Sequence, residues 1–189
     1  VVDEAAPRGV TVTALPGPSA VLTALALSAL PVDRFCFEGF LPRKAGERSS
    51  RVTELAAEPR TMVFFEAPHR LAAMLSALAA GLGDDRRAAV CRELTKTFEE
   101  VRRGLLGDLV TWSSGEVLGE ITVVVEGASA SSRREQAGLV TADDWIRAVQ
   151  ERVDAGQDRR EAVADTARAA GVPRREVYNA VVGAKNPRE

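Results

Sequence analysis

The sequence is poor in the residue types that build metal sites, disulfide frameworks and membrane spans. It has 1 histidine and 2 cysteines, too few for a zinc site of histidine and cysteine ligands. We predict no metal site, although the composition does not exclude a magnesium ion held by carboxylates. Cys36 and Cys91 stand in apolar segments without a Cys-x-x-Cys spacing, which predicts reduced, buried thiols and a cytoplasmic location. No apolar run approaches the ~20 residues that span a bilayer and no signal peptide is recognisable, so we expect no membrane association.

Net charge and aromatic content are also low. The sequence has 25 basic and 27 acidic side chains, a formal charge of −2, which excludes nucleic-acid binding through bulk charge but leaves room for a local basic patch. Only 5% of the residues are aromatic, against 46% hydrophobic residues overall, so the core must consist mainly of alanine, valine and leucine. A length of 189 residues predicts one domain with an appendage, since an average domain has ~150 residues.

Short apolar runs alternate with helix-length segments in the first two-thirds of the chain, which is typical of an α/β domain. The pattern predicts strands over residues 10–15, 35–40, 61–66, 88–94, 99–103 and 119–125. It predicts helices over residues 20–30 and 49–57, and another that carries Leu71, Leu75 and Leu78. The run 61–66 is apolar almost throughout, as in a strand buried on both faces of a sheet. The charged residues 1–8 resemble a linker, and the α/β domain is expected to extend to residue 127.

The composition changes after Gly127, and the strand signals disappear there. Residues 128–140 are rich in serine and arginine, which predicts a linker. Residues 141–189 predict a three-helix module with the spacing of a helix-turn-helix, which begins at a capping pair of Thr141 and Asp144. Arg174 and Arg175 fall on the third helix, where a recognition helix contacts nucleic acid. A purely structural helical cap explains the same pattern equally well.

Four segments carry the side chains best suited to a site. Ser19 and Ala20 start a helix after a Pro-Gly-Pro turn, where backbone N–H groups can receive a polar ligand, although a turn that only starts the helix is the more common explanation. Arg43 and Lys44 lie in a basic loop that either contacts phosphates or is an ordinary solvated loop. Glu66, Ala67, Pro68, His69 and Arg70 follow the most apolar strand, and ligands of open α/β sheets gather beyond such strand ends. Arg92 lies in a charged segment that either forms a polar substrate wall or makes ordinary surface ion pairs.

The order of these segments closely resembles RsmI, a family of bacterial 16S ribosomal RNA (cytidine-2′-O)-methyltransferases that use S-adenosylmethionine and have the tetrapyrrole methylase fold. The segments are Leu-Pro-Gly-Pro-Ser-Ala, Phe-Glu-Gly-Phe-Leu-Pro-Arg-Lys, Val-Phe-Phe-Glu-Ala-Pro-His-Arg-Leu, Cys-Arg-Glu-Leu-Thr-Lys and Gly-Glu-Ile-Thr-Val-Val-Val-Glu-Gly. The family's N-terminal domain, with its Gly-Thr-Pro-Ile-Gly-Asn-type loop and Asp-Ala-Gly-x-Pro segment, is not in this sequence. The resemblance therefore implies the family's C-terminal α/β domain, a mixed sheet with flanking helices, followed by a helix-turn-helix-like module. Such a fragment is expected to have little methyltransferase activity by itself.

The resemblance also implies roles for single residues. S-adenosylmethionine is expected to contact Ser19, Ala20, Glu66, Ala67, Ile121 and Thr122. Glu66 and His69 are the candidate bases for the ribose 2′-hydroxyl, and histidine is a side chain that can accept a proton at neutral pH. The expected RNA contacts are Arg43, Lys44, Arg70, Arg92, Arg174 and Arg175. The implied substrate is 16S ribosomal RNA or the small ribosomal subunit, and the implied assembly is a homodimer.

Two other functions are compatible with the same residues. A methylase of a porphyrin-like small molecule would share the fold, although the arginine loop and the helical tail favour a larger polyanionic substrate. A noncatalytic RNA-binding module is the other alternative. Weak, strongly salt-dependent binding to 16S RNA without cofactor binding would indicate that second alternative.

Overall fold

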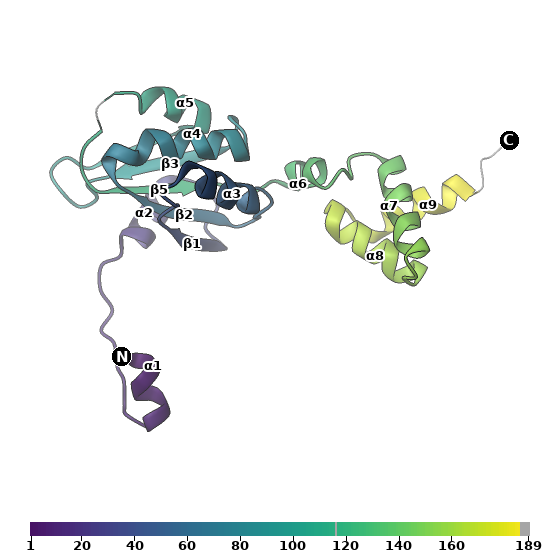
Figure 1. Ribbon diagram of the computed structural model, residues 1–189, viewed down its shortest axis with the longest axis horizontal. Coiled ribbons are helices and arrows are strands. Elements are labelled where there is room, and N and C mark those ends of the chain that lie inside the picture. Colours follow the sequence, from purple (N-terminus) through teal and green to yellow (C-terminus); the bar gives the residue numbers. More distant parts are fainter. Residues whose placement is uncertain (116, 186–189) are drawn as a thin grey trace.

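The computed structural model describes residues 1–115 and 117–185, and its centre is a five-stranded mixed sheet (Figure 1). The strands are β1 (Phe35–Gly39), β2 (Thr61–Glu66), β3 (Arg87–Arg92), β4 (Glu100–Leu105) and β5 (Ile121–Val125), in the order β1-β2-β5-β3-β4. β1 and β2 are parallel, whereas the β2–β5, β5–β3 and β3–β4 pairs are antiparallel. The predicted mixed sheet is therefore present.

Helices cover both faces of this sheet (Figure 1). They are α2 (Ala20–Ser28), α3 (Ala45–Leu55), α4 (Leu71–Leu82) and α5 (Leu106–Trp112). The larger core lies between the sheet and α3, α4 and α5, and includes Phe64 and Val123. A smaller core lies under α2 and includes Val63 and Val124. Because neighbouring residues of β2 and β5 point into opposite cores, both strands are buried on both faces, which confirms the prediction for residues 61–66.

Both cysteines lie in strands, Cys36 in β1 and Cys91 in β3. Cys91 is buried as predicted, whereas Cys36 is only half-buried. Each is a free thiol in the described chain. Burial is the main cause that raises the pKa of Cys36 and of Cys91 to about 11. Both thiols therefore stay protonated at neutral pH and are poor nucleophiles there.

Two predictions for the N-terminal segment are wrong. Residues 10–15 form no strand, because a strand needs a neighbouring edge for its hydrogen bonds and residues 10–19 pair with none within the described chain. The apolar side chains of Val10, Val12 and Leu15 are exposed. Residues 1–8, predicted as a linker, contain the short helix α1 (Val2–Ala5) and a 3-10 turn (Ala6–Arg8).

The helices after the sheet are largely as predicted, with one exception. Residues 128–140, predicted as a linker, contain α6 (Ala130–Gln136), because the Ser129 hydroxyl accepts a hydrogen bond from Ser132 N and caps the helix. α7 (Ala142–Asp154), α8 (Arg159–Ala170) and α9 (Arg174–Lys185) share a core of their own. The capping box of Thr141 and Asp144 starts α7. The domain boundaries themselves stay a prediction, and no helix in the described residues has the length and apolarity that a bilayer crossing requires.

Gly127 fixes the end of β5 against the loop before β2. A Cβ at this position would lie 2.2 Å from Pro59 O, a backbone atom, and Ala128 N donates to Glu58 O over 2.6 Å beside it. We expect Gly127→Ala to lower the free energy of unfolding by ~2–4 kcal/mol, because the two backbones must separate. Urea unfolding followed by circular dichroism measures the effect.

Gly46→Ala is the matched control for that substitution. Gly46 lies in α3 and a Cβ there meets nothing within 4 Å. Alanine should raise the free energy of unfolding by up to ~1 kcal/mol, its advantage over glycine inside a helix. Equal unfolding midpoints for the two variants would contradict the close approach at Gly127.

Candidate functional site

Segments from four strands meet where the strands end, along one side of the sheet that we call the sheet edge. The carboxyl ends of β1, β2 and β3 lie there together with the first residue of β5. In the strand register, Glu66 of β2 and Arg92 of β3 both lie opposite Ile121 of β5. This is the edge at which an open α/β sheet collects its ligands.

A cavity of about 430 Å³ opens at this edge, and we call it the carboxylate cavity because Glu66 lines it. Its lining residues are Ala20, Phe40, Phe65, Glu66, Ala67, Pro68, Gly119, Glu120, Ile121 and Thr122. All the predicted cofactor contacts except Ser19 are in this set. The Ser19 hydroxyl instead accepts a hydrogen bond from Leu22 N and caps α2.

The Glu66 carboxylate is buried, and one of its two oxygens accepts no hydrogen bond within the described chain. Its side chain is 0% exposed, and Oε1 accepts a hydrogen bond from Ala67 N over 2.8 Å. Oε2 lies 3.4 Å from Arg70 Nη2 and has no hydrogen-bond partner within the described chain. Leaving a buried acceptor unpaired costs free energy. A ligand in the cavity that donates a hydrogen bond to Oε2 would remove that cost.

Gly119 lines the carboxylate cavity and packs against the side chain of Glu93. Glu93 belongs to the charged segment around Arg92, but neither Glu93 nor Gly119 was singled out from the sequence as a site residue. Glu93 Oε1 accepts hydrogen bonds from Glu120 N at 2.9 Å and Lys96 Nζ at 3.0 Å, and the bond from Glu120 N is the main cause that lowers the pKa of Glu93. Gly119 has a φ of +96°, and a Cβ there would lie 2.4 Å from Glu93 Cγ. Only glycine fits both the backbone conformation and this approach.

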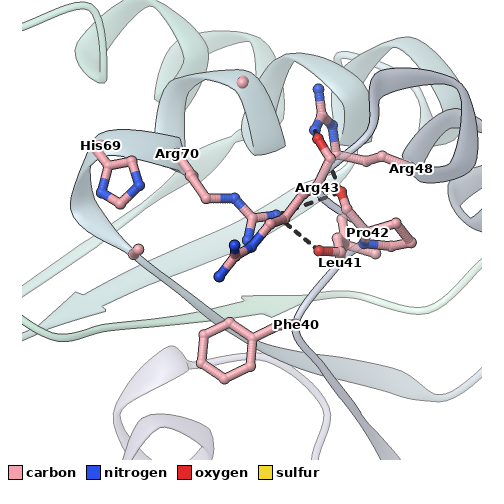
Figure 2. A pocket seen from close by; sticks show the side chains of 9 residues that line it. Phe40, Leu41, Pro42, Arg43, Arg48, His69 and Arg70 are labelled. Atoms are coloured by element: carbon pink, nitrogen blue, oxygen red, sulfur yellow. Dashed lines mark hydrogen bonds between the residues drawn. The ribbon is translucent and has the colours of Figure 1, made fainter.

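A second cavity, of about 820 Å³, adjoins the first, and we call it the arginine cavity. It is lined by Phe40, Leu41, Pro42, Arg43, Arg48, Ala67, His69, Arg70 and Ala73 (Figure 2). The two cavities are neighbours, because Phe40 and Ala67 line both. Of the predicted RNA contacts, Arg43 and Arg70 line the arginine cavity. Lys44 does not, since its side chain is 81% exposed and pairs with Glu47.

Two arginines of this cavity hold the loop after β1. Arg70 Nη2 donates to Leu41 O over 2.8 Å, and Arg48 Nη1 donates to Arg43 O over 3.1 Å. Figure 2 shows these bonds converging on the backbone of the Leu41–Pro42–Arg43 turn. The Arg43 side chain is exposed and has no ion pair among the residues that the structure describes. Arg43 is therefore the cation that an anionic ligand can reach here.

Phe40 stands between the two cavities with a largely exposed ring. Its residue exposure is 62%, and its ring centroid lies 5.9 Å from that of Phe65. Phe65 in turn packs edge-on against Phe37 at 4.9 Å. The sequence signal for Phe40 was only the phenylalanine-rich strand, which does not tell an exposed ring from a buried one.

The family model Tetrapyrrole (Corrin/Porphyrin) Methylases matches residues 1–110. The chain belongs to this family. The match agrees with the mixed sheet and its flanking helices, and it confirms the predicted tetrapyrrole methylase fold.

Curated relatives of this tetrapyrrole methylase carry the name "Ribosomal RNA small subunit methyltransferase I". The relative from Mycobacterium tuberculosis (strain ATCC 25618 / H37Rv) is 51% identical over 175 residues, which are 92% of this chain and 59% of that protein. The relative from Pseudomonas aeruginosa is 44% identical over 140 residues, 72% of this chain and 50% of that protein. Among solved structures, the methyltransferase CobJ has a TM-score of 0.49 at 22% identity, and the match covers 66% of this chain and 55% of that one. The chain thus spans between half and three-fifths of the length of these two relatives.

The remaining predicted residues of this tetrapyrrole methylase lie outside the two cavities. Arg92 pairs with Glu100 and lines a separate hollow beside Trp112. Arg174 and Arg175 lie on α9. This helix belongs to the group formed by α7, α8 and α9, which we call the helical group and which lies at a distance from the sheet edge (Figure 1). The contact of Arg174 and Arg175 with RNA, like that of Lys44, stays a prediction.

Proposed function

We propose that this chain is part of an S-adenosylmethionine-dependent methyltransferase that modifies 16S ribosomal RNA at the 2′-hydroxyl of a cytidine. The observation that carries the proposal is the 51% identity, over 92% of the chain, to ribosomal RNA small subunit methyltransferase I of M. tuberculosis. The two neighbouring cavities support it, because one offers the buried carboxylate of Glu66 and the other the exposed cation of Arg43. The cytidine and the 2′ position rest on the resemblance of the sequence segments.

The carboxylate cavity has a donor and acceptor set that fits S-adenosylmethionine. Glu66 Oε2 pairs with Arg70 at 3.4 Å but accepts no hydrogen bond within the described chain. It can therefore accept one from a ribose hydroxyl or an amino group. Phe65, Pro68 and Ile121 offer apolar surface to an adenine ring. The bound cofactor supplies a methyl group that is already activated, so the task of these residues is to align it and to exclude water.

The arginine cavity and Phe40 suit the nucleotide that receives the methyl group. Arg43 can contact a phosphate next to the target. A target nucleotide must leave its stack before its 2′-hydroxyl can reach a buried donor, and an exposed aromatic ring stabilises the unstacked base. Phe40 lies at the boundary where such a base would need support.

The structure separates the two candidate bases. Glu66 is buried in the carboxylate cavity, whereas His69 is exposed and lines the arginine cavity. We assign proton transfer to His69 and cofactor orientation to Glu66. The His69 imidazole would accept the proton of the ribose 2′-hydroxyl while Glu66 would hold the cofactor that supplies the methyl group.

A chimera tests the proposal directly. In it, this chain replaces the segment of the M. tuberculosis relative to which it aligns. We expect the chimera to transfer tritium from labelled S-adenosylmethionine into 16S RNA of 30S subunits, and mass spectrometry of the digested RNA should find the label on a cytidine ribose. The unaltered relative is the positive control, and 50S subunits are the negative control.

Other outcomes of that experiment would contradict the proposal. Transfer of the methyl group to a porphyrin-like acceptor instead of RNA would favour the small-molecule alternative. RNA binding without any transfer would favour the noncatalytic module. Cytoplasmic location and a homodimer are part of the proposal as well, and light scattering of the purified chimera measures the second.

A further inference from the structure

A third cleft, of about 400 Å³, lies in the helical group, between the first turn of α8 and the middle of α9. Its lining residues are Asp158, Arg159, Arg160, Val163, Arg174, Tyr178, Val181 and Val182. Val163 and Val181 form its floor and belong to the core of the helical group. On the rim, Tyr178 is 57% exposed and Val182 is 41% exposed. We call this the α8–α9 cleft, an apolar hollow with an exposed aromatic ring at its edge.

The charges around the α8–α9 cleft are predominantly positive. Arg159, Arg160 and Arg174 line it, and within the described residues none of them forms an ion pair. Two arginines elsewhere on these helices do form ion pairs, Arg147 with Asp144 and Arg168 with Asp165. Three arginines without an ion pair among the described residues therefore lie together at the rim of the cleft, whereas Arg152 and Arg175, which form none either, do not line it.

Two details keep these cations available. The Asp158 carboxylate is engaged as the N-cap of α8, where Oδ1 accepts hydrogen bonds from Arg160 N at 2.8 Å and Glu161 N at 3.2 Å. Arg174 Nη2 donates to Arg160 O over 3.2 Å, which holds that guanidinium at the rim and leaves its other N–H groups free for a ligand.

We propose that the α8–α9 cleft binds a single-stranded segment of RNA, with one base against Tyr178 and neighbouring phosphates at Arg159, Arg160 and Arg174. An exposed aromatic ring combined with arginines is the chemistry that holds unpaired bases and their backbone. An acidic peptide would satisfy the arginines but would leave the exposed ring and the apolar floor unused. The inference rests on the proposed function, since it adds a second RNA contact outside the sheet edge. Arg175, the other predicted contact on α9, does not line the cleft, and its contact with RNA stays a prediction.

Fluorescence anisotropy with a labelled, unstructured 12-nucleotide RNA tests the inference in the full chain. Tyr178→Ala should weaken binding about 5- to 10-fold, the loss of one stacked base, whereas Tyr178→Phe should keep binding within about 2-fold because the ring remains. Arg174→Ala should weaken binding and lower the slope of log Kd against log salt by about 0.7, the contribution of one phosphate contact to a single strand. The exposure of Tyr178 makes loss of folding unexpected, and circular dichroism checks this.

Arg168→Ala is the matched control, because Arg168 is an exposed arginine on α8 that is paired with Asp165 and does not line the cleft. It should leave RNA affinity unchanged. Unchanged affinity of Tyr178→Ala, or equal losses for Arg168→Ala and Arg174→Ala, would overturn the inference, and so would equally strong competition by an oligoglutamate peptide. If the chimera transfers the methyl group but the cleft variants bind RNA as well as the unaltered chain does, this inference alone is overturned. Cleft-dependent RNA binding without methyl transfer would overturn the proposed function alone.

Discussion

Replacing Glu66 with glutamine should weaken the binding of S-adenosylmethionine to the chimera about 10- to 100-fold. The substitution keeps the shape of the side chain and the acceptor for Ala67 N, but it removes the charge from the buried Oε2. A hydrogen bond to a charged group contributes ~1.5–3 kcal/mol, which corresponds to this loss of affinity. Isothermal titration calorimetry measures the dissociation constant.

Glu38→Gln is the matched control for Glu66→Gln. Glu38 lies on the neighbouring strand β1, its side chain is 11% exposed and it pairs with Arg51, yet it does not line the carboxylate cavity. Its replacement should leave cofactor affinity within about 2-fold, since a carboxylate outside the cavity has no contact with the ligand. Equal losses for both variants would show that the effect at Glu66 is general destabilisation.

His69→Ala separates the two roles that Glu66 and His69 have in the proposal. It should lower the rate of methyl transfer about 100-fold or more, as loss of a general base does, without changing the dissociation constant of the cofactor. Normal turnover of both the His69→Ala and the Glu66→Gln variants would show that His69 does not transfer the proton and that Glu66 does not orient the cofactor.

The sequence predicts the buried strands well because their composition leaves little choice. Residues 61–66 and 121–125 are apolar or uncharged except for Glu66, and such runs are stable only between two layers of helices. The run 61–66 also predicts that Glu66 lies at the carboxyl end of a buried strand. Residues 10–15 have a similar composition, but a strand also needs a partner, and no pattern in those residues reports whether one is present.

The parts of the site that the sequence did not predict depend on contacts that only the folded chain makes. Arg48 enters the arginine cavity because its guanidinium turns back to Pro42 O and Arg43 O, which only the folded loop reveals. Gly119 matters because the Glu93 side chain passes within 2.4 Å of where a Cβ would be. α5 was missed because Gly107 and Asp108 interrupt its apolar pattern, although Leu106 and Leu109 are buried.

Replacing Arg70 with lysine should lower kcat/KM of the chimera for 30S subunits about 10- to 100-fold. The Arg70 side chain is 19% exposed and connects the two cavities, because Nη2 donates to Leu41 O and lies 3.4 Å from Glu66 Oε2. A lysine ammonium has no planar fork and cannot hold both partners in this geometry. Either the loop that carries Arg43 loosens or the ion pair with the buried carboxylate weakens, and complete loss of such a pair costs ~3–5 kcal/mol. RNA affinity should therefore fall in the first case and cofactor affinity in the second.

Arg87→Lys provides the control for Arg70→Lys, since Arg87 has the same kind of partners at the opposite edge of the sheet. It donates to Ala29 O over 3.0 Å and lies 3.3 Å from Glu126. Its side chain is 53% exposed, so lysine there should change stability by less than ~1 kcal/mol and leave both affinities unchanged.

A double-mutant cycle of Glu66→Gln and Arg70→Met tests whether the two cavities are coupled. Arg70 is the ion-pair partner of Glu66 among the described residues. Once Arg70 is replaced, Glu66→Gln should therefore cost clearly less than it does alone. Residues in one ion-pair network show coupling of ~0.5–3 kcal/mol. Such coupling, measured on cofactor affinity, would mean that the loop carrying Arg43 and the carboxylate that binds the cofactor adjust together. Strictly additive effects would mean that each cavity works alone and that Arg70 serves only the loop.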